Sequence, residues 1–343
     1  MASAVRSRPK RRILMIVHEA LVPPEGWEKL TWEESNEFRT EVDVLEGLQK
    51  LGHEVTVLGL SDELAPLSRA LRHIKPHVVF NLLEEFRDQS VYDSHVVSYL
   101  ELRRAAYTGC NPRGLIIARD KALSKKILHY HRISVPHFTT FRRGKKVRRP
   151  KRLAFPLIVK SQIEEASYGI AQASVVWDDE ALVERVAFIH ENLRTDAIVE
   201  QYIEGRELYS AVLGNERLQV FPTWELVLDG LPEDSVRIAT RKAKWDLAYQ
   251  KKYGIVDRPA ELDDAIRRRI VRLTTRIVRA LGLDGYARID FRLTPEGHPY
   301  FLEANPNPDV AFDFEFANAA KAGGLDYEQM LQRIVNLGIR RGA

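Results

Sequence analysis

Side chains that could bind a metal ion occur in the stretch Tyr286–Asp309. Asp290 lies in a segment where polar and apolar residues alternate, and Glu303 and Asn305 follow in a second segment after a Thr-Pro-Glu-Gly-His sequence. The Pro and Gly favour a turn, so the stretch is predicted to form a β-hairpin. Residues two apart on a strand point to the same face, which places Glu303 and Asn305 together.

An in-register hairpin would bring these three side chains together beside Arg288. Magnesium prefers hard oxygen ligands, few of them from protein, with water and phosphate completing its coordination. The sequence therefore predicts a magnesium site at Asp290, Glu303 and Asn305. The same residues are also compatible with an edge hairpin whose polar face meets solvent, in which Arg288 merely pairs with Asp290.

Composition indicates an ordinary globular protein. The chain has 343 residues, of which 45% are hydrophobic and 29% charged, so a disordered or fibrous chain is excluded. Its length allows two or three domains with a sizeable core. Cys110 is the only cysteine, which rules out an intramolecular disulfide and favours a reducing compartment.

The N-terminal residues do not predict a targeting segment. Residues 5–12 are basic and precede the apolar run Ile13–Val17, but this run is too short for the core of a signal peptide. Apolar runs elsewhere stay well below the ~18 residues that a membrane span needs. We expect a soluble, cytoplasmic protein that does not contact a membrane.

Positive charge is concentrated in one segment. The net charge is +4, and eight Lys or Arg residues lie between Arg142 and Arg152. Such a cluster could bind nucleic acid or an anionic substrate. Aromatic residues that could stack on bases are missing from the segment, so we interpret it as a solvated loop between two domains and do not expect a nucleic-acid partner.

The first part of the chain is predicted to be a parallel α/β unit. Apolar runs at 12–17, 55–60 and 77–83 read as buried strands, and residues 37–51 have apolar positions at helical spacing. Buried strands with a helix between them are typical of parallel sheets. Residues 81–86 would lie at the carboxyl end of a strand, where such sheets bind ligands.

The later parts are predicted to be two α+β units. A helix at 120–131, a strand at 155–160 that ends in Lys160, and a polar loop at 161–169 belong to the first of them. Further strands are predicted at 197–203 and 208–213, and helices at 179–193, 262–281 and 326–337. The predicted domains are 12–116, 117–200 and 201–343.

Seven short motifs occur in an order that resembles the ATP-grasp superfamily, specifically D-alanine:D-alanine ligase and its relatives. The resemblance covers residues 12–337 and implies an ATP-grasp fold, in which an N-terminal parallel α/β domain is followed by two α+β subdomains that clamp ATP. The motifs are Val79-Phe-Asn-Leu-Leu83, Tyr107-Thr-Gly109, Asp120-Lys-Ala-Leu-Ser-Lys125, Leu157-Ile-Val-Lys160, Val199-Glu-Gln-Tyr-Ile-Glu-Gly-Arg-Glu207, Ala287-Arg-Ile-Asp-Phe291 and Leu302-Glu-Ala-Asn305.

Such ligases phosphorylate a carboxylate with ATP and let an amine attack the acyl phosphate, a reaction that needs positive charge around the phosphates. The resemblance implies that Lys121 and Lys160 contact the phosphates. It likewise implies that Glu200 and the backbone of Gln201 and Ile203 bind the adenine, and that Glu207 binds the ribose. Two magnesium ions, with manganese as an alternative, are assigned to Asp290, Glu303 and Asn305. The reacting phosphoryl group is assigned to Arg288, Lys244 and Ser167.

Departures from the family pattern occur where the amino acids would bind. Glu84-Glu85 replaces a His-Gly, and the family's Glu-Val-Ser has only a loose substitute in Glu33 or Glu34. The phosphate lid Glu165–Gly169 keeps only its serine, Ser167, and its last glycine. After the hairpin, Pro308-Asp309 replaces Pro-Gly, and Phe314-Glu315 replaces a Ser-Leu that binds a carboxylate.

These substitutions predict a changed substrate. Replacing the carboxylate-binding Ser-Leu by Phe-Glu adds bulk and a negative charge that would repel a carboxylate, so D-alanyl-D-alanine is not the expected product. We expect a substrate with a positive or neutral group facing Glu315, Asp309 or Glu84.

Two functions are compatible with the sequence. The first is an ATP-dependent carboxylate–amine ligase acting on an amino acid or a peptide, with a homodimer as the family's usual assembly. The second is a nucleotide-binding protein that lost ligation and acts through partners. Arg288 occurs together with the metal residues, which favours the ligase, because a binding module has less need of an arginine at the reacting centre.

Overall fold

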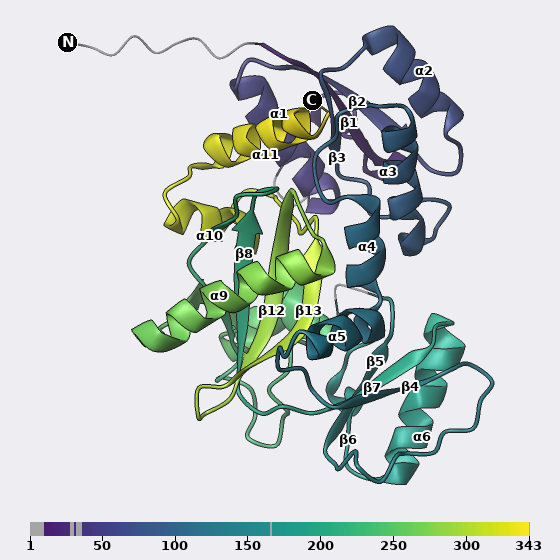
Figure 1. Cartoon of the computed structure of the whole chain (residues 1–343), viewed down its shortest axis with the longest axis vertical. Helices are drawn as coiled ribbons and strands as arrows, with labels where there is room; N and C mark the ends of the chain where they lie inside the picture. Colours follow the sequence, from purple (N-terminus) through teal and green to yellow (C-terminus); the bar gives the residue numbers. More distant parts are fainter. Residues whose placement is uncertain (1–9, 28–30, 32–35, 165–166, 343) are drawn as a thin grey trace. The chain divides into compact units, whose positions relative to one another are not determined.

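The computed structural model describes residues 10–27, 31, 36–164 and 167–342 (Figure 1). The chain divides into two compact units. Unit 1 combines Met1–Pro112 with Asp309–Ala343, and unit 2 is Arg113–Pro308. The division into domains at 12–116, 117–200 and 201–343 stays a prediction, and the two units are described separately.

Unit 1 contains a parallel three-stranded sheet, as the sequence predicts. Its order is β2-β1-β3, with parallel pairing on both sides of β1. The five apolar residues Ile13–Val17 are fully buried, which explains why this strand is an unbroken apolar run. The strands are β1 (Arg12–His18), β2 (Glu54–Leu60) and β3 (Val78–Asn81).

Helices from both ends of the sequence complete unit 1. The last helix packs against α1 and against β3. Gly338 permits this approach, because a Cβ there would lie 2.7 Å from the carbonyl oxygen of Tyr107. The helices are α1 (Arg39–Lys50), α2 (Ala65–Ile74), α3 (Asp93–Leu102), α10 (Glu315–Ala322) and α11 (Tyr327–Arg341). Helix α4 (Pro112–Arg119) follows α3 in the chain and belongs to unit 2 except for its first residue.

Unit 2 contains two antiparallel sheets. The first has the order β4-β7-β5-β6 and packs its buried residues against α6 (Asp179–Phe188) through Leu182 and Val186. Helix α5 (Lys121–Tyr130) begins where the Asp120 carboxylate accepts from the backbone N–H groups of two residues in its first turn. The strands are β4 (Phe138–Phe141), β5 (Leu157–Ser161), β6 (Val175–Val176) and β7 (Ala197–Gln201).

The second sheet contains the predicted hairpin. Its order is β11-β10-β8-β12-β13, with β9 beside β8. The predicted hairpin is present: Arg288 pairs with Asn305 and Asp290 with Glu303, and the register shifts between Asp290 and Phe291. The strands are β8 (Arg206–Leu213), β9 (Gln219–Val220), β10 (Trp224–Val227), β11 (Val256–Pro259), β12 (Tyr286–Leu293) and β13 (Pro299–Pro306).

The alternation in β12 reflects two different faces of the sheet. Strand β12 lies between β8 and β13 and is not an edge strand. Helix α9 (Asp264–Leu281) crosses the face of β8 and β12 in Figure 1, and Thr274 donates a hydrogen bond to Ser210 of β8. Ser210 pairs with Ile289, so the apolar residues of β12 face α9 and the polar ones face the other side. Strand β13 is the edge of the sheet, so the hairpin does lie at an edge. The alternative in which its polar face meets solvent is wrong, since Asp290 is 2% exposed and Asn305 9%.

Shorter elements connect these layers. Helices α7 (Arg241–Trp245) and α8 (Leu247–Tyr253) follow strand β10. Four 3-10 helices and one π-helical turn are also present in the described residues: Glu19–Leu21, Asn36–Phe38, Ser90–Tyr92, Gln172–Ser174 and Ile189–Leu193.

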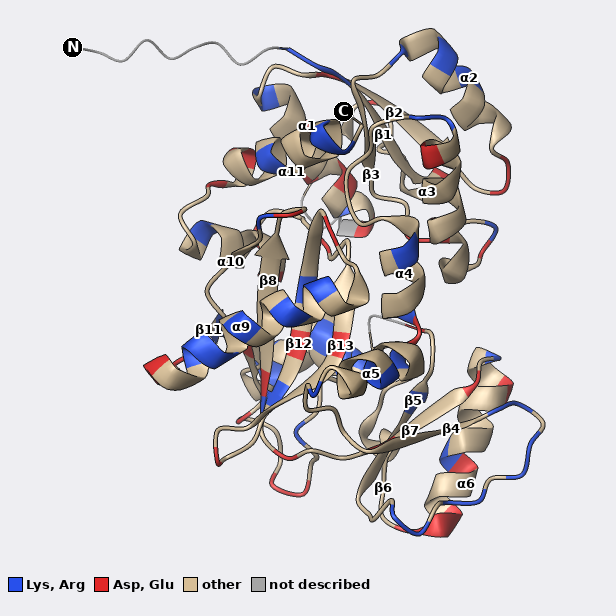
Figure 2. Ribbon diagram, in the orientation of Figure 1, with Lys and Arg blue, Asp and Glu red and all other residues tan. Residues whose placement is uncertain are grey.

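The basic segment 142–152 connects β4 to β5 and is mostly exposed (Figure 2). It is solvated, as predicted, but it joins two strands of one sheet, so the interpretation as a loop between domains is wrong. Within the part of the chain that the structure describes, no helix combines the length and the apolar character needed to cross a membrane.

Candidate active site

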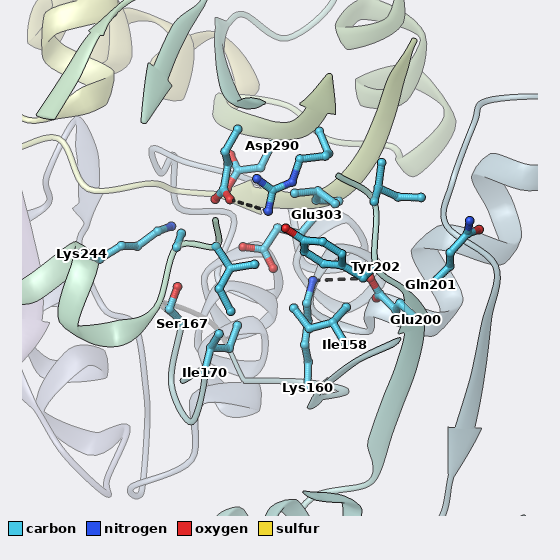
Figure 3. Close-up of a pocket in the computed structure, with 16 residues that line it drawn as sticks. Ile158, Lys160, Ser167, Ile170, Glu200, Gln201, Tyr202, Lys244, Asp290 and Glu303 are labelled. Carbon is cyan, nitrogen blue, oxygen red and sulfur yellow. Dashed lines mark hydrogen bonds and ion pairs between the residues drawn. The ribbon is translucent and has the colours of Figure 1, made fainter. Parts of the chain in front are cut away.

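An open pocket of about 560 Å³ lies in unit 2, lined by residues of both sheets and of two connecting segments (Figure 3). Nine residues that the sequence proposed for the site line it: Lys160, Ser167, Glu200, Gln201, Ile203, Glu207, Lys244, Asp290 and Glu303. Three proposed residues are not among the lining residues, but each contacts the side chain of one: Lys121 contacts Glu303, and Arg288 and Asn305 contact Asp290.

A buried carboxylate lies between two lysines in the first sheet. Glu200 of β7 is fully buried and forms ion pairs with Lys125 at 3.0 Å and with Lys160 at 3.4 Å. Burial by itself would raise the pKa of Glu200, but the two lysines outweigh it and hold the pKa below its usual value. Glu200 is therefore an ionised hydrogen-bond acceptor at the wall of the pocket.

Lys125 is a site residue that sequence reasoning missed. It is fully buried, pairs with Glu200, and donates a hydrogen bond to the carbonyl of Leu302 in the other sheet. Its position in the Asp120–Lys125 motif was a possible signal. A lysine on a short helix normally points to solvent, however, and nothing in its local sequence shows that α5 turns this one inward.

The chain after Glu200 forms a short hinge into the second sheet. The backbone N–H of Gln201 donates to the carbonyl of His137 at 2.7 Å, and that of Tyr202 to the carbonyl of Pro156 at 3.0 Å. At Gln201, the backbone group that could meet an adenine edge is therefore the carbonyl. Ile203, next in line, is 8% exposed and lines the pocket.

A second buried ion pair lies across strands β8 and β12. Glu207 and Arg292 are cross-strand partners, with a guanidinium nitrogen 3.2 Å from a carboxylate oxygen. Arg292 also donates to the carbonyls of Gly205 and Arg237 at 3.1 and 3.0 Å. Sequence reasoning missed Arg292, although its place in the alternation with Arg288 and Asp290 was a signal.

The predicted metal residues converge on the hairpin. Asp290 accepts two hydrogen bonds from the guanidinium of Arg288, at 2.8 and 3.0 Å, and one from the amide of Asn305 at 3.0 Å. Glu303 is its cross-strand partner, and a register shift next to this pair turns Leu302 as well as Glu303 toward the pocket. The hairpin thus holds two carboxylates and a carboxamide at one place.

The charges around Glu303 favour an anion-binding centre. Lys121 lies 3.5 Å from the Glu303 carboxylate. Burial would raise the pKa of Glu303, but Lys121, Lys160, Lys244 and Arg288 lower it to about 2. Burial raises the pKa of Asp290 despite the opposing effect of Arg288. A divalent cation would remove this penalty on Asp290, so the donor set fits magnesium.

Two further segments contribute residues to the pocket lining. Ser167, in a left-handed conformation with φ 58°, comes from the loop after β5, and Lys244 comes from α7. Figure 3 shows the side chain of Lys244 pointing toward Asp290, with Ser167 below Lys244. The lid residues Glu165 and Ala166 lie outside the described residues, as do Glu33 and Glu34.

The residues that depart from the family pattern after the hairpin lie in unit 1. Asp309 accepts hydrogen bonds from the Thr40 hydroxyl at 2.9 Å and from the backbone of Ala311 at 2.8 Å. Phe314 is the N-terminal capping residue of α10 and lies under the Arg39 guanidinium, 5.1 Å from its ring centre. Glu315 occupies the first turn of α10, where a helix N-terminus favours negative charge.

A family model described as "D-ala D-ala ligase C-terminus" matches residues 127–336, which is more than half of the chain. The chain belongs to the D-alanine–D-alanine ligase family. Its strongest site motifs, from β5 to β13, all fall within the matched residues. It is an ATP-grasp enzyme, an ATP-dependent ligase that forms carbon–nitrogen bonds, and the alternative of a nucleotide-binding protein without ligation is not favoured.

Relatives of similar length support membership of this ligase family. The chain is 30% identical over 326 residues to "Uncharacterized protein y4sG" of Sinorhizobium fredii, covering 93% of this chain and 90% of the relative. It is also 30% identical over 314 residues to a D-alanine–D-alanine ligase of Syntrophotalea carbinolica, covering 89% and 92%.

Solved structures of the family share the fold. A D-alanine–D-alanine ligase from Bacillus anthracis complexed with ATP superimposes with a TM-score of 0.75 at 21% identity, covering 97% of this chain and 98% of that one. The VanG D-Ala:D-Ser ligase of Enterococcus faecalis gives 0.70 at 22% identity, covering 96% and 100%. The ATP-grasp fold predicted from the motifs is confirmed.

Proposed function

We propose that this ligase uses ATP and magnesium to join the carboxylate of one amino acid or peptide to the amine of another, through an acyl phosphate. The observation that carries the proposal is the hairpin cluster, in which Arg288, Asp290, Glu303 and Asn305 converge beside lysines from three other elements. Such a cluster matches the needs of phosphoryl transfer, where positioning and neutralisation of charge supply most of the rate.

The pocket offers a complementary group for each part of ATP. The ionised Glu200 can accept from the exocyclic amine of adenine, next to the Gln201 carbonyl and Ile203. Glu207, held by Arg292, can accept from ribose hydroxyls. We assign Lys121 and Lys160 to the phosphates, and Lys244 with Ser167 to the terminal phosphate.

Asp290, Glu303 and Asn305 would hold the magnesium ions, two by the family resemblance, with manganese as a substitute. When bound, these ions neutralise the phosphate oxygens and fix their geometry. The substrate carboxylate attacks the terminal phosphorus of ATP and ADP leaves; the amine then attacks the acyl carbon, and phosphate leaves as the amide forms. Arg288, oriented by two hydrogen bonds to Asp290, stabilises the negative charge that develops on the transferring and acyl oxygens.

The second substrate is proposed to differ from D-alanine. Phe314 and Glu315 replace a Ser-Leu of the family, and a glutamate there repels a substrate carboxylate. We expect the double variant Phe314→Ser/Glu315→Leu, which restores the family's Ser-Leu, to gain turnover with D-alanine, measured as phosphate release. An unchanged substrate profile in that variant would count against a role of these two residues in specificity.

The function is tested by magnesium-dependent phosphate release from ATP in the presence of pooled D- and L-amino acids and dipeptides, followed by mass spectrometry. A new ligated mass is expected with the wild type and with the surface variant Asp234→Ala, and no product with Asp290→Ala. Phosphate release that is equal in wild type and Asp290→Ala would contradict the proposal. A homodimer and a cytoplasmic location stay predictions from the sequence; light scattering of the purified protein tests the former.

A further inference from the structure

Two segments that line the pocket are joined to each other behind it. The first is the lid root, which we define as Ser167–Ser174, and the second is the Lys244 segment, Val236–Trp245. The side-chain amide of Gln172 donates to the carbonyl of Val236 at 3.1 Å and accepts from its N–H at 2.8 Å. One side chain therefore satisfies both backbone groups of a residue in the other segment, as a neighbouring β-strand would.

Further contacts extend this junction along both segments. The backbone N–H of Arg241 donates to the carbonyl of Ile170 at 3.1 Å, and the Arg241 guanidinium lies 5.4 Å from the ring centre of Tyr168. Beneath them, Ile238 is 2% exposed and belongs to a small apolar cluster against which Ile170 and Val236 pack. Backbone, side-chain and apolar contacts all hold the two segments together.

The Lys244 segment can transmit this contact to its lysine. Thr240 caps α7 by accepting from the N–H of Ala243 at 3.1 Å. The side chain of Gln250 donates to the carbonyls of Ala243 and Lys244, at 3.0 and 2.9 Å. These bonds fix the turn that carries Lys244.

The lid root is anchored on its other side by a buried arginine. Arg185 of α6 is 8% exposed and donates to the carbonyl of Gly169 and to the Ser174 hydroxyl. Among the described residues it has no carboxylate partner, and burial lowers its pKa. The lid root is thus fastened to α6 below and to the Lys244 segment above.

We propose that Gln172 is a positioning residue that couples the lid root to the Lys244 segment, so that Ser167 and Lys244 reach the terminal phosphate of ATP together. This inference rests on the proposed function, because it assigns Lys244 to that phosphate. It adds a residue outside the motifs and outside the pocket lining, and it makes the two phosphate contacts dependent on each other.

The test compares two nucleotides in the full-length chain. With magnesium present, Gln172→Ala is expected to weaken binding of a slowly hydrolysed ATP analogue about tenfold, since two hydrogen bonds that hold the Lys244 segment are lost. Binding of ADP, which lacks the terminal phosphate, should change less than about twofold. Calorimetric titration measures both affinities, and this difference separates positioning of Lys244 from a general loss of stability.

A double-mutant cycle with Lys244→Ala tests the coupling directly. If Gln172 acts through Lys244, Gln172→Ala should have almost no further effect on analogue affinity once Lys244 is removed. Gln329→Ala is the matched control, because it removes a glutamine–backbone hydrogen bond at the start of α11 in unit 1. It should leave both affinities unchanged.

The outcomes separate this inference from the proposed function. A wild type that binds neither nucleotide refutes the proposed function. Suppose that the wild type binds both nucleotides, but Gln172→Ala lowers the affinities for ADP and the analogue equally, or the effects of Gln172→Ala and Lys244→Ala on affinity simply add. Either result refutes the coupling and leaves the proposed function standing. Should Gln172→Ala fail to fold by circular dichroism, Gln172→Glu gives the same comparison, because it keeps the side-chain shape but repels the Val236 carbonyl.

Discussion

The buried carboxylate at position 200 shows how a few side chains determine the character of the pocket. Glu200 is compensated by two lysines, of which Lys125 is fully buried and Lys160 is 9% exposed. Three charges in one place are tolerated only because each has an opposite partner. The same arrangement keeps Glu200 ionised and hence a hydrogen-bond acceptor, as its proposed role toward an adenine amine requires.

Replacing Glu200 should reveal the strength of this compensation. Glu200→Gln leaves the buried Lys125 charge without a counter-charge, so we expect the free energy of unfolding to fall by roughly 3–5 kcal/mol. The double variant Glu200→Gln/Lys125→Met removes the stranded charge and should recover part of this loss. Urea unfolding measures both. If the stability losses of the two single variants simply add in the double variant, the ion pair between Glu200 and Lys125 does not compensate the buried charges.

Glu41 should make stability depend on pH. This α1 residue is 5% exposed, and burial, with a smaller effect of Asp309, raises its pKa from 4.5 to about 7. Between these two values the folded chain keeps a proton that the unfolded chain releases. The stabilising contribution is therefore complete below pH 4.5 and is lost as pH rises through about 7.

Glu41→Gln removes this titration, so the variant should exceed the wild type in unfolding free energy by about 3 kcal/mol at pH 8, with the difference shrinking toward pH 4.5. Urea unfolding at half-unit pH steps measures the two slopes. Parallel stability curves for the two proteins would contradict the assignment of this pH dependence to Glu41.

At the scale of elements, the sequence predicts what local patterns encode. The alternation around Asp290 and the Pro-Gly turn were enough to place the hairpin and the face that carries its polar residues, because period-two patterning decides which face a strand residue occupies. The long helix α9 followed from periodicity, and the buried strands β1 and β3 from their apolar runs. Strand β2 was also predicted to be buried, which is wrong for most of its residues, because it lies at the edge of the sheet. Family motifs then assigned roles that patterning alone left open.

The missed features depend on contacts between distant parts of the chain. Lys125 is inward because α5 packs so that its side chain reaches β7 and β13, and Gln172 matters because Val236 lies beside it. Helices α7 and α8 were not predicted, since five and seven residues are too few for a periodic signal. Tertiary packing, not propensity, produces each of these.

Helix α7 should affect nucleotide binding through its cap. Thr240→Ala removes the side-chain acceptor for the Ala243 N–H, at a cost of about 1 kcal/mol in stability. Because the helix carries Lys244, affinity for the ATP analogue should fall severalfold. Asp326→Ala, which removes the equivalent cap of α11 in unit 1, should lower stability similarly but leave the affinity unchanged. Equal effects of Thr240→Ala and Asp326→Ala on affinity for the analogue would mean that α7 has no specific role in nucleotide binding.

At the scale of the whole molecule, charge is divided unequally between the units. Arg113–Pro308 contains 34 Lys and Arg against 26 Asp and Glu, a formal +8, so the remaining residues carry −4. The positive unit is the one whose pocket is proposed to bind a polyphosphate. An excess of positive charge raises the local concentration and association rate of an anionic ligand, and this effect weakens with salt.

This division leads to a prediction about a fragment. All residues that line the pocket lie between Arg113 and Pro308, and this unit has its own apolar clusters. A fragment of these residues should therefore fold and bind magnesium–ATP within about tenfold of the full chain, as measured by circular dichroism and calorimetry. Lys160→Ala in the fragment should abolish most of this binding.

The same fragment should not form a ligated product with any amino-acid pool. The residues proposed to face the amino acids, Glu84, Asp309 and Glu315, all belong to unit 1 and are absent from it. Mass spectrometry of the reaction mixture decides this, with the full chain as the positive control. Product formation by the fragment would move the amino-acid site into unit 2 and would remove unit 1 from the explanation of substrate choice. A folded fragment without affinity for ATP would instead show that the nucleotide pocket needs unit 1.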